Sequence, residues 1–367
     1  MSAKNTTFGL LPLATLALAV TVPAQQSFTA GAVYTMTNEA SGNRVAVFDR
    51  ATDGVVTFNG YVPTQGLGTD AGLGNQGGLI LTDDERFLLV CNAGSHDISV
   101  FAVGESSLTL VDRAPTRGLE PVSIAQHDQL VYVVNDVSSS IAGFELRDDG
   151  ALVPLRRSVR PLSADVTDPA QISFSPNGRF LYVTEKATNV IDQFRVGRDG
   201  TPIGLRQSIP SANTTPFGFA FGMRNQLFLS EAGAGMPGQG TVSSYDVGPL
   251  GSLNGLTTAV ATGETATCWV VGTPSGRLIY ASNTGSDSVS SFRVDFDGSL
   301  QLLDAQAATT GDRPLDMAVS NDGLFFYVLN AGAGSIGDYR IEPNGALASL
   351  PGTNSGLPAS ASGLAAR

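Results

Sequence analysis

Two glutamates and one lysine are the residues of this sequence whose types and spacing best suit proton transfer. Glu185 and Glu231 each end a short apolar segment, and Lys186, the only lysine beyond residue 4, directly follows the first of them. Two carboxyl groups held close together can differ in pKa, so that one acts as a general acid and the other as a general base. We predict that all three are catalytic, with the lysine holding a substrate carboxylate or stabilising developing negative charge.

The same segment occurs in five further copies that end in asparagine rather than glutamate. These asparagines are Asn38, Asn92, Asn135, Asn283 and Asn330. An asparagine at this position can stabilise a loop by hydrogen bonding to the local backbone. The two glutamates could therefore be alternative loop anchors or partners in surface salt bridges, and both interpretations stay open. We also name Asn92 and Asn135 as candidates for substrate binding.

Further candidates lie near the start of the first strand expected in each copy. Gln171, Trp269 and Asp316 occupy equivalent positions there and should surround the mouth of a central channel. Trp269 is the only tryptophan, and it could either pack in the core or offer a flat surface to a ligand ring. Arg313 could bind a substrate carboxylate, and His96 could act as a general base or a ligand. Both could equally be ordinary surface residues.

Several common kinds of site are disfavoured. Three segments match G-x-G-x-x-G, at 72–77, 233–238 and 332–337, but each lies between strands, so we expect flexible loops rather than a dinucleotide site. Two histidines cannot form a three-histidine zinc site, and no G-x-S-x-G segment occurs. We predict no cofactor and no metal, with one alternative in which the carboxylates and Asn92, Asn135 and Asn283 bind calcium.

The seven copies indicate a repeated structural element. Their cores start at residues 35, 89, 132, 182, 228, 280 and 327, so the spacing is 43 to 54 residues. A repeat of roughly 40–50 residues built from short strands indicates a β-propeller, and four antiparallel strands per copy are typical of a blade. We predict an all-β, seven-bladed propeller. The loops after the second strands and the connectors between blades should share the functional face, opposite the Asn-Gly and Asp-Gly turns.

The ring has to close, and the two ends of the chain suggest how. The first copy begins near Ala32 with its second strand and lacks a first one, whereas the segment after Pro358 is left over. We predict that this C-terminal segment supplies the innermost strand of the first blade, which removes an open sheet edge. Cys91 and Cys268 fall in the second and sixth copies, which are not neighbours in a ring, so we expect two buried free thiols.

The Tyr-Val-Thr-Asn-like core, the turn at Ser175–Arg179 and the seven copies resemble the β-propeller lactonase family over about residues 31–367. That family includes 6-phosphogluconolactonase-like proteins and the enzyme that lactonises 3-carboxymuconate. The resemblance implies a lactonase, which is a carboxylic-ester hydrolase, or a lactonizing cycloisomerase, acting on a small lactone or organic acid. Family members often carry a Pro-His pair at an inner strand. The corresponding pairs here lack the histidine: Pro121-Val122, Pro169-Ala170, Pro216-Phe217 and Pro314-Leu315.

The net charge indicates which partners the protein could bind, and the N-terminal sequence indicates where it is located. The formal net charge of −12 argues against nucleic acid or an anionic membrane as a partner. Residues 1–24, with Lys4 and an apolar run from Leu10 to Val22, are predicted to be a secretory signal peptide. A linker (25–30) and the propeller (31–367) follow. We expect a secreted or periplasmic monomer without membrane contact after cleavage.

A non-catalytic propeller that binds a carbohydrate, a peptide or a surface polymer is the alternative to a lactonase.

Overall fold

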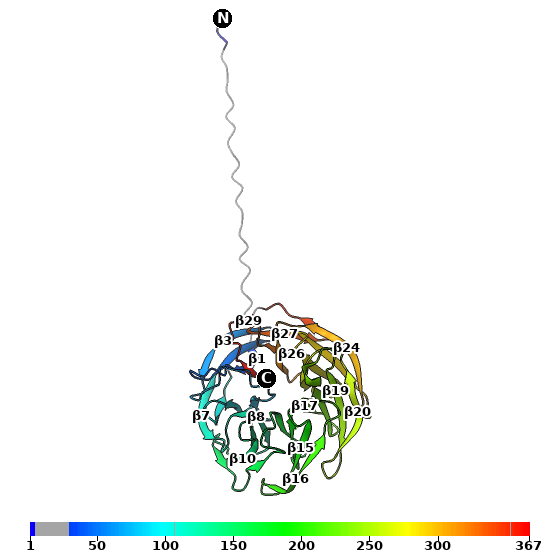
Figure 1. Cartoon of the computed structure of the whole chain (residues 1–367). Helices are drawn as coiled ribbons and strands as arrows, with labels where there is room; N and C mark the ends of the chain where they lie inside the picture. The colour runs from blue at the N-terminus through cyan, green and yellow to red at the C-terminus, as the bar shows by residue number, and fades with distance from the viewer. Residues whose placement is uncertain (4–28, 106, 353) are drawn as a thin grey trace.

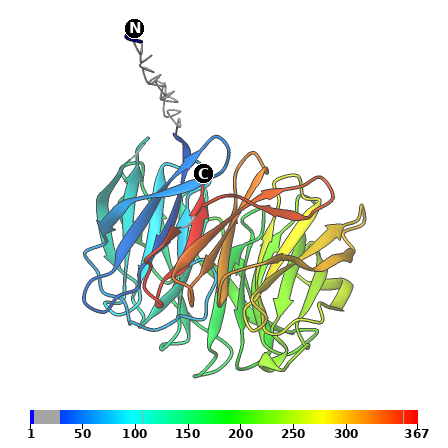
Figure 2. The same cartoon turned by 90° about the horizontal axis from the view of Figure 1, so that it is seen from above.

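The computed structural model describes residues 1–3, 29–105, 107–352 and 354–367. From Thr29 onward the strands form seven antiparallel sheets arranged in a ring (Figure 1). The side view shows that the strands run between the two faces of this ring (Figure 2). Each sheet has four strands in its main path, so the predicted all-β, seven-bladed propeller is confirmed.

The blades are numbered along the chain and contain the following strands. Blade 1 contains β1 (Thr29–Met36), β2 (Arg44–Ala51), β3 (Val56–Pro63) and β30 (Ser362–Ala366). Blade 2 contains β4 (Leu79–Leu81), β5 (Phe87–Asn92), β6 (Asp97–Val103) and β7 (Leu108–Pro115). Blade 3 contains β8 (Pro121–His127), β9 (Leu130–Asn135), β10 (Ser140–Leu146) and β11 (Leu152–Pro154), with β12 (Arg160–Pro161) also paired to β10. Blade 4 contains β13 (Pro169–Phe174), β14 (Phe180–Glu185), β15 (Val190–Val196) and β16 (Pro202–Pro210).

The remaining blades follow the same order. Blade 5 contains β17 (Pro216–Phe221), β18 (Gln226–Glu231), β19 (Thr241–Val247) and β20 (Leu253–Ala261), with the short 3-10 helix η1 (Gly233–Gly235) after β18. Blade 6 contains β21 (Thr267–Gly272), β22 (Leu278–Asn283), β23 (Ser288–Val294) and β24 (Leu300–Thr309). Blade 7 contains β25 (Pro314–Val319), β26 (Phe325–Asn330), β27 (Ser335–Ile341) and β28 (Leu347–Ser349), with β29 (Asn354–Ser355) also paired to β27.

The second strand of a blade is buried on both faces because a neighbouring blade packs against each side. β14 and β18 are buried at all six positions, which explains why their sequences are nearly continuous apolar runs. The outermost strands β16 and β20 are mostly exposed, with partial burial at only a few positions. The core therefore lies between the blades, and the loops at either end of the strands are free to carry a site.

The C-terminal strand closes the ring, as the sequence predicted. β30 pairs antiparallel with β1, and Tyr34 lies opposite Ala365. The backbones of Ala32 and Arg367 exchange two hydrogen bonds of 3.2 and 2.9 Å, and Arg50 Nε donates to the carbonyl of Arg367 at 2.9 Å. In Figure 1 the C-terminal end lies beside β1 near the centre of the ring. Blade 1 is therefore built from both ends of the propeller sequence.

Buried tyrosines connect each of several blades to the next. The hydroxyls of Tyr132, Tyr182, Tyr280 and Tyr327 each donate to the carbonyl of a turn glycine in the following blade. The acceptors are Gly200, Gly251, Gly345 and Gly54, at 2.7 to 3.0 Å. All four glycines have φ between 77° and 88°, which a residue with a side chain rarely adopts. The repeated tyrosine and the repeated turn glycine are therefore two halves of one contact.

Two further expectations concern the cysteines and the N-terminus. Cys91 and Cys268 are buried and unpaired, as predicted. Residues 4–24 of the predicted signal peptide lie outside the described residues. Within the described part of the chain, no helix has the length and apolar character needed to cross a bilayer.

Candidate functional site

The two glutamates lie at the ends of β14 and β18 in neighbouring blades, and both side chains are fully buried. Glu231 accepts hydrogen bonds from the hydroxyls of Thr241 and Ser243, each at 2.7 Å. Glu185 accepts one from Thr188 at 2.6 Å. Thr241, Ser243 and Thr188 belong to the same blade as the glutamate that they contact. The N–H of Ser163 and the hydroxyl of Ser211, in the connectors before blades 4 and 5, also donate to Glu185 and Glu231, at 3.0 and 3.4 Å. The geometry matches the loop-anchor interpretation, because neither carboxyl group can reach a substrate without local opening of its blade.

A third carboxyl group adjoins Glu185 inside blade 4. The pKa of Asp192 is raised to about 8, chiefly by burial and also by its hydrogen bond to Glu185. Ser208 donates to Asp192 at 2.5 Å, and the Nε of Arg206 lies 3.0 Å from its second oxygen. Asp192 therefore keeps its proton at neutral pH and can share it in a hydrogen bond with Glu185 inside the blade. Such a pair is a structural arrangement of carboxyl groups rather than an open acid–base pair.

Asn92 and Asn135 hold the equivalent place in blades 2 and 3, and both are fully buried. The amide of Asn92 donates to Asp97 at 2.7 Å and to Ser99 at 2.8 Å, both on the next strand. Asn135 donates to the carbonyl of Ser140 at 3.4 Å. The asparagines thus tie the second strand to the third, and the structure places neither one where a substrate could contact it.

The residues proposed as calcium ligands are not brought together. Asn283 also stays within its own blade, where it donates to Ser288 and Ser290 at 3.0 and 2.9 Å. Over the residues that the structure describes, no group of three His, Cys, Asp or Glu side chains is arranged to hold a metal ion. The calcium alternative therefore has no support in the geometry of these side chains.

The centre of the ring is crossed by residues 74–78, which we call the channel segment. β4 is only three residues long because the chain before it leaves the sheet of blade 2. The N–H of Gln76 donates to the carbonyl of Ala170 in blade 4 at 2.9 Å. Its side-chain amide exchanges two hydrogen bonds, of 2.7 and 3.0 Å, with the backbone of Val270 in blade 6. This segment, which has no regular secondary structure, thus connects blades on different sides of the ring.

Other members of the channel segment contact further blades. Trp269 of blade 6 donates through Nε1 to the carbonyl of Asn75 at 2.7 Å, and Ser362 of blade 1 donates to the Asn75 side chain at 2.9 Å. The N–H of Gly77 donates to Asp316 of blade 7 at 3.1 Å. The sequence predicted a flexible loop for this glycine-rich segment. It is instead held on several sides, and its glycines allow the close approach.

Gln171, Trp269 and Asp316 lie on the first strands of blades 4, 6 and 7, and the last two contact the channel segment. All three are buried. Burial raises the pKa of Asp316 to about 7, against the lowering effect of three backbone N–H groups that include that of Gly77. The side chain of Gln171 accepts the N–H of Phe219 from blade 5 at 2.6 Å. Their visible role is to hold neighbouring blades and the channel segment in place.

The mouth of the channel is built from an unusual backbone position that recurs in five blades. The residue before each first strand has a left-handed conformation, with φ between 47° and 62°. These residues are Glu120, Asp168, Thr215, Ala266 and Arg313. Each carbonyl accepts the N–H of the residue that follows the repeat core, at 2.8 to 3.1 Å. Non-glycine residues in this conformation are uncommon and concentrate at functional sites.

Only blades 3 and 4 carry charged side chains at both of these positions. Lys186 lies 2.9 Å from Asp168 and donates to the carbonyl of Gly74 at 2.5 Å, with only 9% of its side chain exposed. The pKa of Asp136 is raised to about 6, chiefly by burial and also by the charges of Asp168 and Glu120, whereas Lys186 lowers it. Three carboxyl groups and one ammonium group therefore meet at the mouth, and we call these four residues the mouth cluster.

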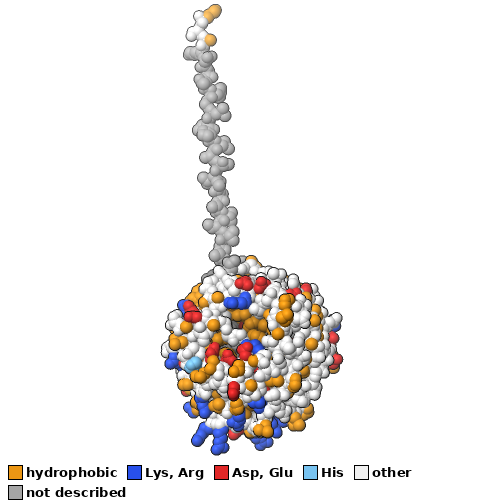
Figure 3. All heavy atoms as spheres, viewed as in Figure 1, with side chains coloured by type: hydrophobic (Ala, Val, Ile, Leu, Met, Phe, Trp, Pro, Cys, Tyr) orange, Lys and Arg blue, Asp and Glu red, His pale blue; other side chains and the backbone are white. Residues whose placement is uncertain are grey.

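His96 and Arg313 lie next to this mouth without joining the cluster. The Nδ1 of half-buried His96 lies 3.0 Å from the N–H of Glu120 and accepts its hydrogen bond when the proton is on Nε2. Arg313 is exposed in blade 7, across the ring from blades 3 and 4, and donates to the carbonyl of Ala359 at 2.8 Å. On the face drawn in Figure 3, acidic and basic side chains surround a hollow near the centre of the ring.

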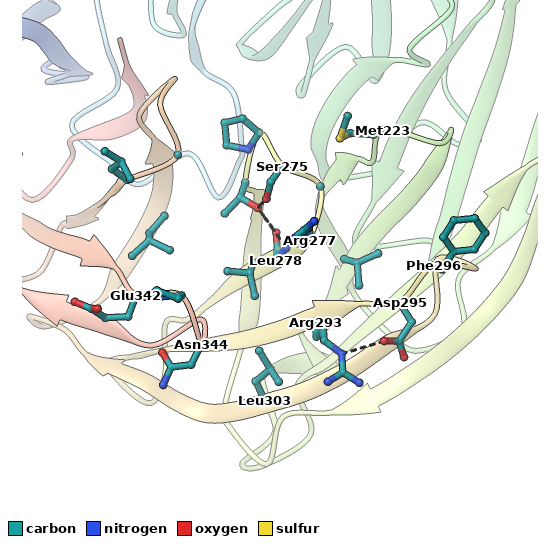
Figure 4. Close-up of a pocket in the computed structure, with 18 of the residues that line it drawn as sticks. Met223, Ser275, Arg277, Leu278, Arg293, Asp295, Phe296, Leu303, Glu342 and Asn344 are labelled. Carbon is teal, nitrogen blue, oxygen red and sulfur yellow. Dashed lines mark hydrogen bonds and ion pairs between the residues drawn. The ribbon is translucent and has the colours of Figure 1, made fainter.

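A wide pocket of about 1100 Å³ lies on the opposite face, between the turns of blades 5, 6 and 7. Figure 4 shows Arg293 paired with Asp295, at 2.9 Å, with Phe296 next to Asp295 and Met223 on another side of the pocket. The guanidinium of Arg224 lies 3.9 Å from the centre of the Phe296 ring. The sequence placed function on the other face, so this pocket is a site that the repeat pattern did not predict.

The comparisons with known proteins agree with the fold. The family model described as lactonase, 7-bladed β-propeller, matches residues 28–161, 122–233 and 239–358. A solved structure of a proposed 6-phosphogluconolactonase from Bacteroides fragilis superposes with a TM-score of 0.73 at 19% identity, covering 94% of this chain and 100% of that one. The periplasmic gluconolactonase of Pseudomonas aeruginosa gives 0.70 at 18% identity, covering 90% and 98%.

Relatives in sequence match over a shorter length. The 6-phosphogluconolactonase of Yersinia pseudotuberculosis is 33% identical over 93 residues, which are 24% of this chain and 28% of that protein. The one from Yersinia enterocolitica is 29% identical over 118 residues, 31% and 35% of the two chains. These alignments span about a third or less of the relatives, whereas the family model spans most of the propeller. The chain therefore belongs to the family of seven-bladed β-propeller lactonases.

Proposed function

We propose that this protein hydrolyses a lactone at the mouth cluster. The observation that supports this most directly is Asp136, a half-buried carboxyl group whose pKa is raised to about 6, beside an ammonium group. A carboxylate with this pKa is ionised at neutral pH and yet basic enough to take a proton from water. Membership in a lactonase family and the 6-phosphogluconolactonase activity named for the Yersinia relatives support the reaction class.

Two groups of the cluster, Asp136 and Lys186, each have a step in the proposed reaction. A water molecule held by Asp136 attacks the lactone carbonyl carbon, and Asp136 takes a proton from that water. Lys186 has one N–H beyond those directed at Asp168 and Gly74, and this N–H stabilises the oxyanion. The ring C–O bond then breaks, and Asp136 returns the proton to the leaving alkoxide, which gives the open hydroxy acid.

The remaining predicted site residues take supporting roles in this proposal. Glu185 anchors the end of β14 directly before Lys186, and Glu231 does the same for β18 in blade 5. His96 holds the backbone of Glu120. Arg313 would reach only a ligand large enough to extend across the ring.

Substitution of the two central groups tests the reaction. Asp136→Asn should lower kcat by about 10²- to 10⁴-fold because the base is lost. Lys186→Met should lower it by about 10²- to 10³-fold because an oxyanion donor is lost. The rate of hydrolysis is measured for a panel of lactones, with and without a chelator, and proton release is the signal that is recorded. In the parent protein kcat/KM should rise as the pH passes about 6, and Asp136→Asn should lose that limb.

Glu39→Gln is the matched control for this test. Glu39 occupies the equivalent position in blade 1, where it is paired with Arg44 at 2.5 Å and lies outside the mouth cluster. Its substitution should leave kcat and the pH profile unchanged. Full activity in both Asp136→Asn and Lys186→Met would place the reaction elsewhere.

A second candidate function is ligand binding without catalysis in the 1100 Å³ pocket on the opposite face. The exposed Phe296, backed by Arg224, forms an aromatic platform of the kind that carbohydrates stack on. This candidate predicts that Phe296→Ala weakens binding of an oligosaccharide and that no lactone is hydrolysed. Isothermal titration with oligosaccharides, together with the lactone panel, separates the two functions.

We also propose that the protein is exported. The support is sequence alone: Lys4, the apolar run from Leu10 to Val22 and the small residues around Ala24. N-terminal sequencing of protein recovered outside the cytoplasm should begin at Gln25. A mature protein that retains Leu10–Val22 would contradict the proposal.

A further inference from the structure

The mouth cluster carries an unbalanced negative charge. Glu120, Asp136 and Asp168 supply three carboxyl groups, and Lys186 supplies the single ammonium group among them. Arg117, three residues before Glu120, does not compensate, because its guanidinium donates to the carbonyl of Leu155 on the outer side of blade 3 at 3.0 Å. An anionic substrate would therefore meet electrostatic repulsion at this mouth, and added salt would weaken that repulsion.

Exposed apolar side chains stand next to these charges. Leu119, Val137 and Val166 are 46%, 58% and 75% exposed. Leu119 precedes Glu120, Val137 follows Asp136, and Val166 lies two residues before Asp168. The same loops are tied together by hydrogen bonds from Ser139 to the carbonyl of Asp165, at 3.0 Å, and from Thr167 to Ser139, at 3.1 Å. We call Leu119, Val137 and Val166 the apolar rim.

From this arrangement we infer that the mouth takes an uncharged lactone bearing an apolar substituent and disfavours phosphorylated sugar lactones. The inference rests on the proposed lactone hydrolysis and narrows its substrate class. The lactone ring is neutral, so the carboxyl groups do not repel it and can hydrogen-bond its polar atoms through water. The apolar rim gives the substituent a surface to cover. A phosphate group would bring close to two further negative charges to an already acidic mouth.

Two substrate series test the inference. In the first, kcat/KM is measured for γ- and δ-lactones with alkyl substituents of increasing length, and it should rise by up to about fourfold per methylene that the rim covers. In the second, δ-gluconolactone is compared with 6-phosphogluconolactone at low and high salt. The phosphorylated lactone should be the poorer substrate by at least tenfold at low salt, and added salt should narrow the difference.

Variants of the apolar rim provide the second readout. The double substitution Val137→Ser with Val166→Ser should flatten the dependence of kcat/KM on chain length. Leu205→Ser is the matched control, because Leu205 is 93% exposed on β16 at the outside of blade 4. In this control variant, kcat/KM should rise with chain length as steeply as in the parent protein.

The outcomes separate this inference from the proposed function. If no lactone is hydrolysed, both fail. If lactones are hydrolysed and the phosphorylated one is preferred, or the chain-length slope is absent, the reaction stands and the substrate class inferred here is overturned. If kcat/KM depends on chain length in the double variant as it does in the parent protein, the apolar rim does not take part in substrate recognition.

Discussion

Carboxyl groups at equivalent or neighbouring positions of the repeat have different tasks because their surroundings differ. Burial raises the pKa of Glu231, and hydrogen bonds from Ser243, Thr241 and Ser211 oppose that shift, so its partners hold it inside the blade. Asp136 directly follows a repeat core, at the position that Lys186 has in blade 4. Unlike Glu231, it is only half-buried, and it lies beside charges of both signs. Proton exchange with a substrate needs this second kind of environment, in which the group can be reached and its pKa is near neutral.

The buried pair of Asp192 and Glu185 should make stability depend on pH. The pKa of Asp192 is raised from 3.8 to about 8, so between these values the folded protein holds a proton that the unfolded chain releases. This contribution is complete below about pH 4 and is lost as the pH rises through about 8. The free energy of unfolding should therefore fall with rising pH, by up to about 1.4 kcal/mol per unit from this group.

Asp192→Asn tests this dependence, because an amide cannot titrate. Urea unfolding between pH 5 and 8 should give a smaller slope for the variant. Some slope should remain, because the pKa values of Asp316 and Asp136, about 7 and about 6, are also raised. Asp246→Asn, at an exposed position of β19, is the control and should keep the parent slope. An unchanged slope in Asp192→Asn would show that this pair does not hold the extra proton.

At the scale of the elements, the tyrosine contacts explain why the repeat combines a core tyrosine with a turn glycine. The hydroxyl of Tyr182 leaves blade 4 and reaches the carbonyl of Gly251 in blade 5 at 2.8 Å. Packing between blades is apolar and therefore not directional, whereas a hydrogen bond at each of these four junctions fixes the position of one blade along the next.

Removing one of these hydroxyls should have a measurable cost. Tyr182→Phe leaves the buried carbonyl of Gly251 without this partner, so the free energy of unfolding should drop by about 1 to 3 kcal/mol. Tyr61→Phe is the control, because its hydroxyl bonds to the carbonyl of Gly356 at 3.2 Å in an exposed setting. Its effect should stay below that of Tyr182→Phe in denaturant unfolding. If the two substitutions lowered the free energy of unfolding equally, the hydrogen bond between blades would contribute no more to stability than an exposed one.

The channel segment should tolerate no added side chain where the blades approach it. A Cβ on Gly218 of blade 5 would lie 1.9 Å from the side-chain oxygen of Gln76, whereas one on Gly72 would meet nothing within 4 Å. Gly218→Ala should therefore cost about 1 to 3 kcal/mol by overpacking, and Gly72→Ala should leave the melting temperature within about a degree. Thermal unfolding of the two variants makes the comparison. If Gly218→Ala is as stable as the parent, the segment is not tightly held.

At the scale of the whole molecule, periodicity determined what the sequence could predict. The strand order, the seven blades, the closure and the two free thiols all follow from the spacing of one core and the leftover C-terminal segment. The position of the channel segment did not, because it depends on contacts of Gln76 with residues of blades 4 and 6 that are distant in the sequence. The inward direction of Glu185 also depends on packing between strands, which position in the repeat does not reveal.

The mouth cluster could have been found by reading the positions next to the core rather than the core itself. Glu120, Asp136, Asp168 and Lys186 are the only set in which neighbouring repeats carry charge both before the first strand and after the core. What the sequence could not show is the left-handed backbone of Glu120 and Asp168 and the distances within the cluster, since those arise from the packing of the connectors.

Closure of the ring gives the last prediction. Deleting residues 363–367 removes most of β30, exposes the edge of β1 and breaks the two backbone hydrogen bonds between Ala32 and Arg367. A buried inner strand is lost, so the free energy of unfolding should fall by several kcal/mol, a large part of the 5–15 kcal/mol typical of a folded domain. The open edge should also promote association, which size-exclusion chromatography would detect. Arg367→Ala is the control, because it removes side-chain bonds to residues 104 and 105 but leaves the strand paired. Its melting temperature should stay close to that of the parent, and an equally unchanged value for the deletion would refute closure by β30 as a source of stability.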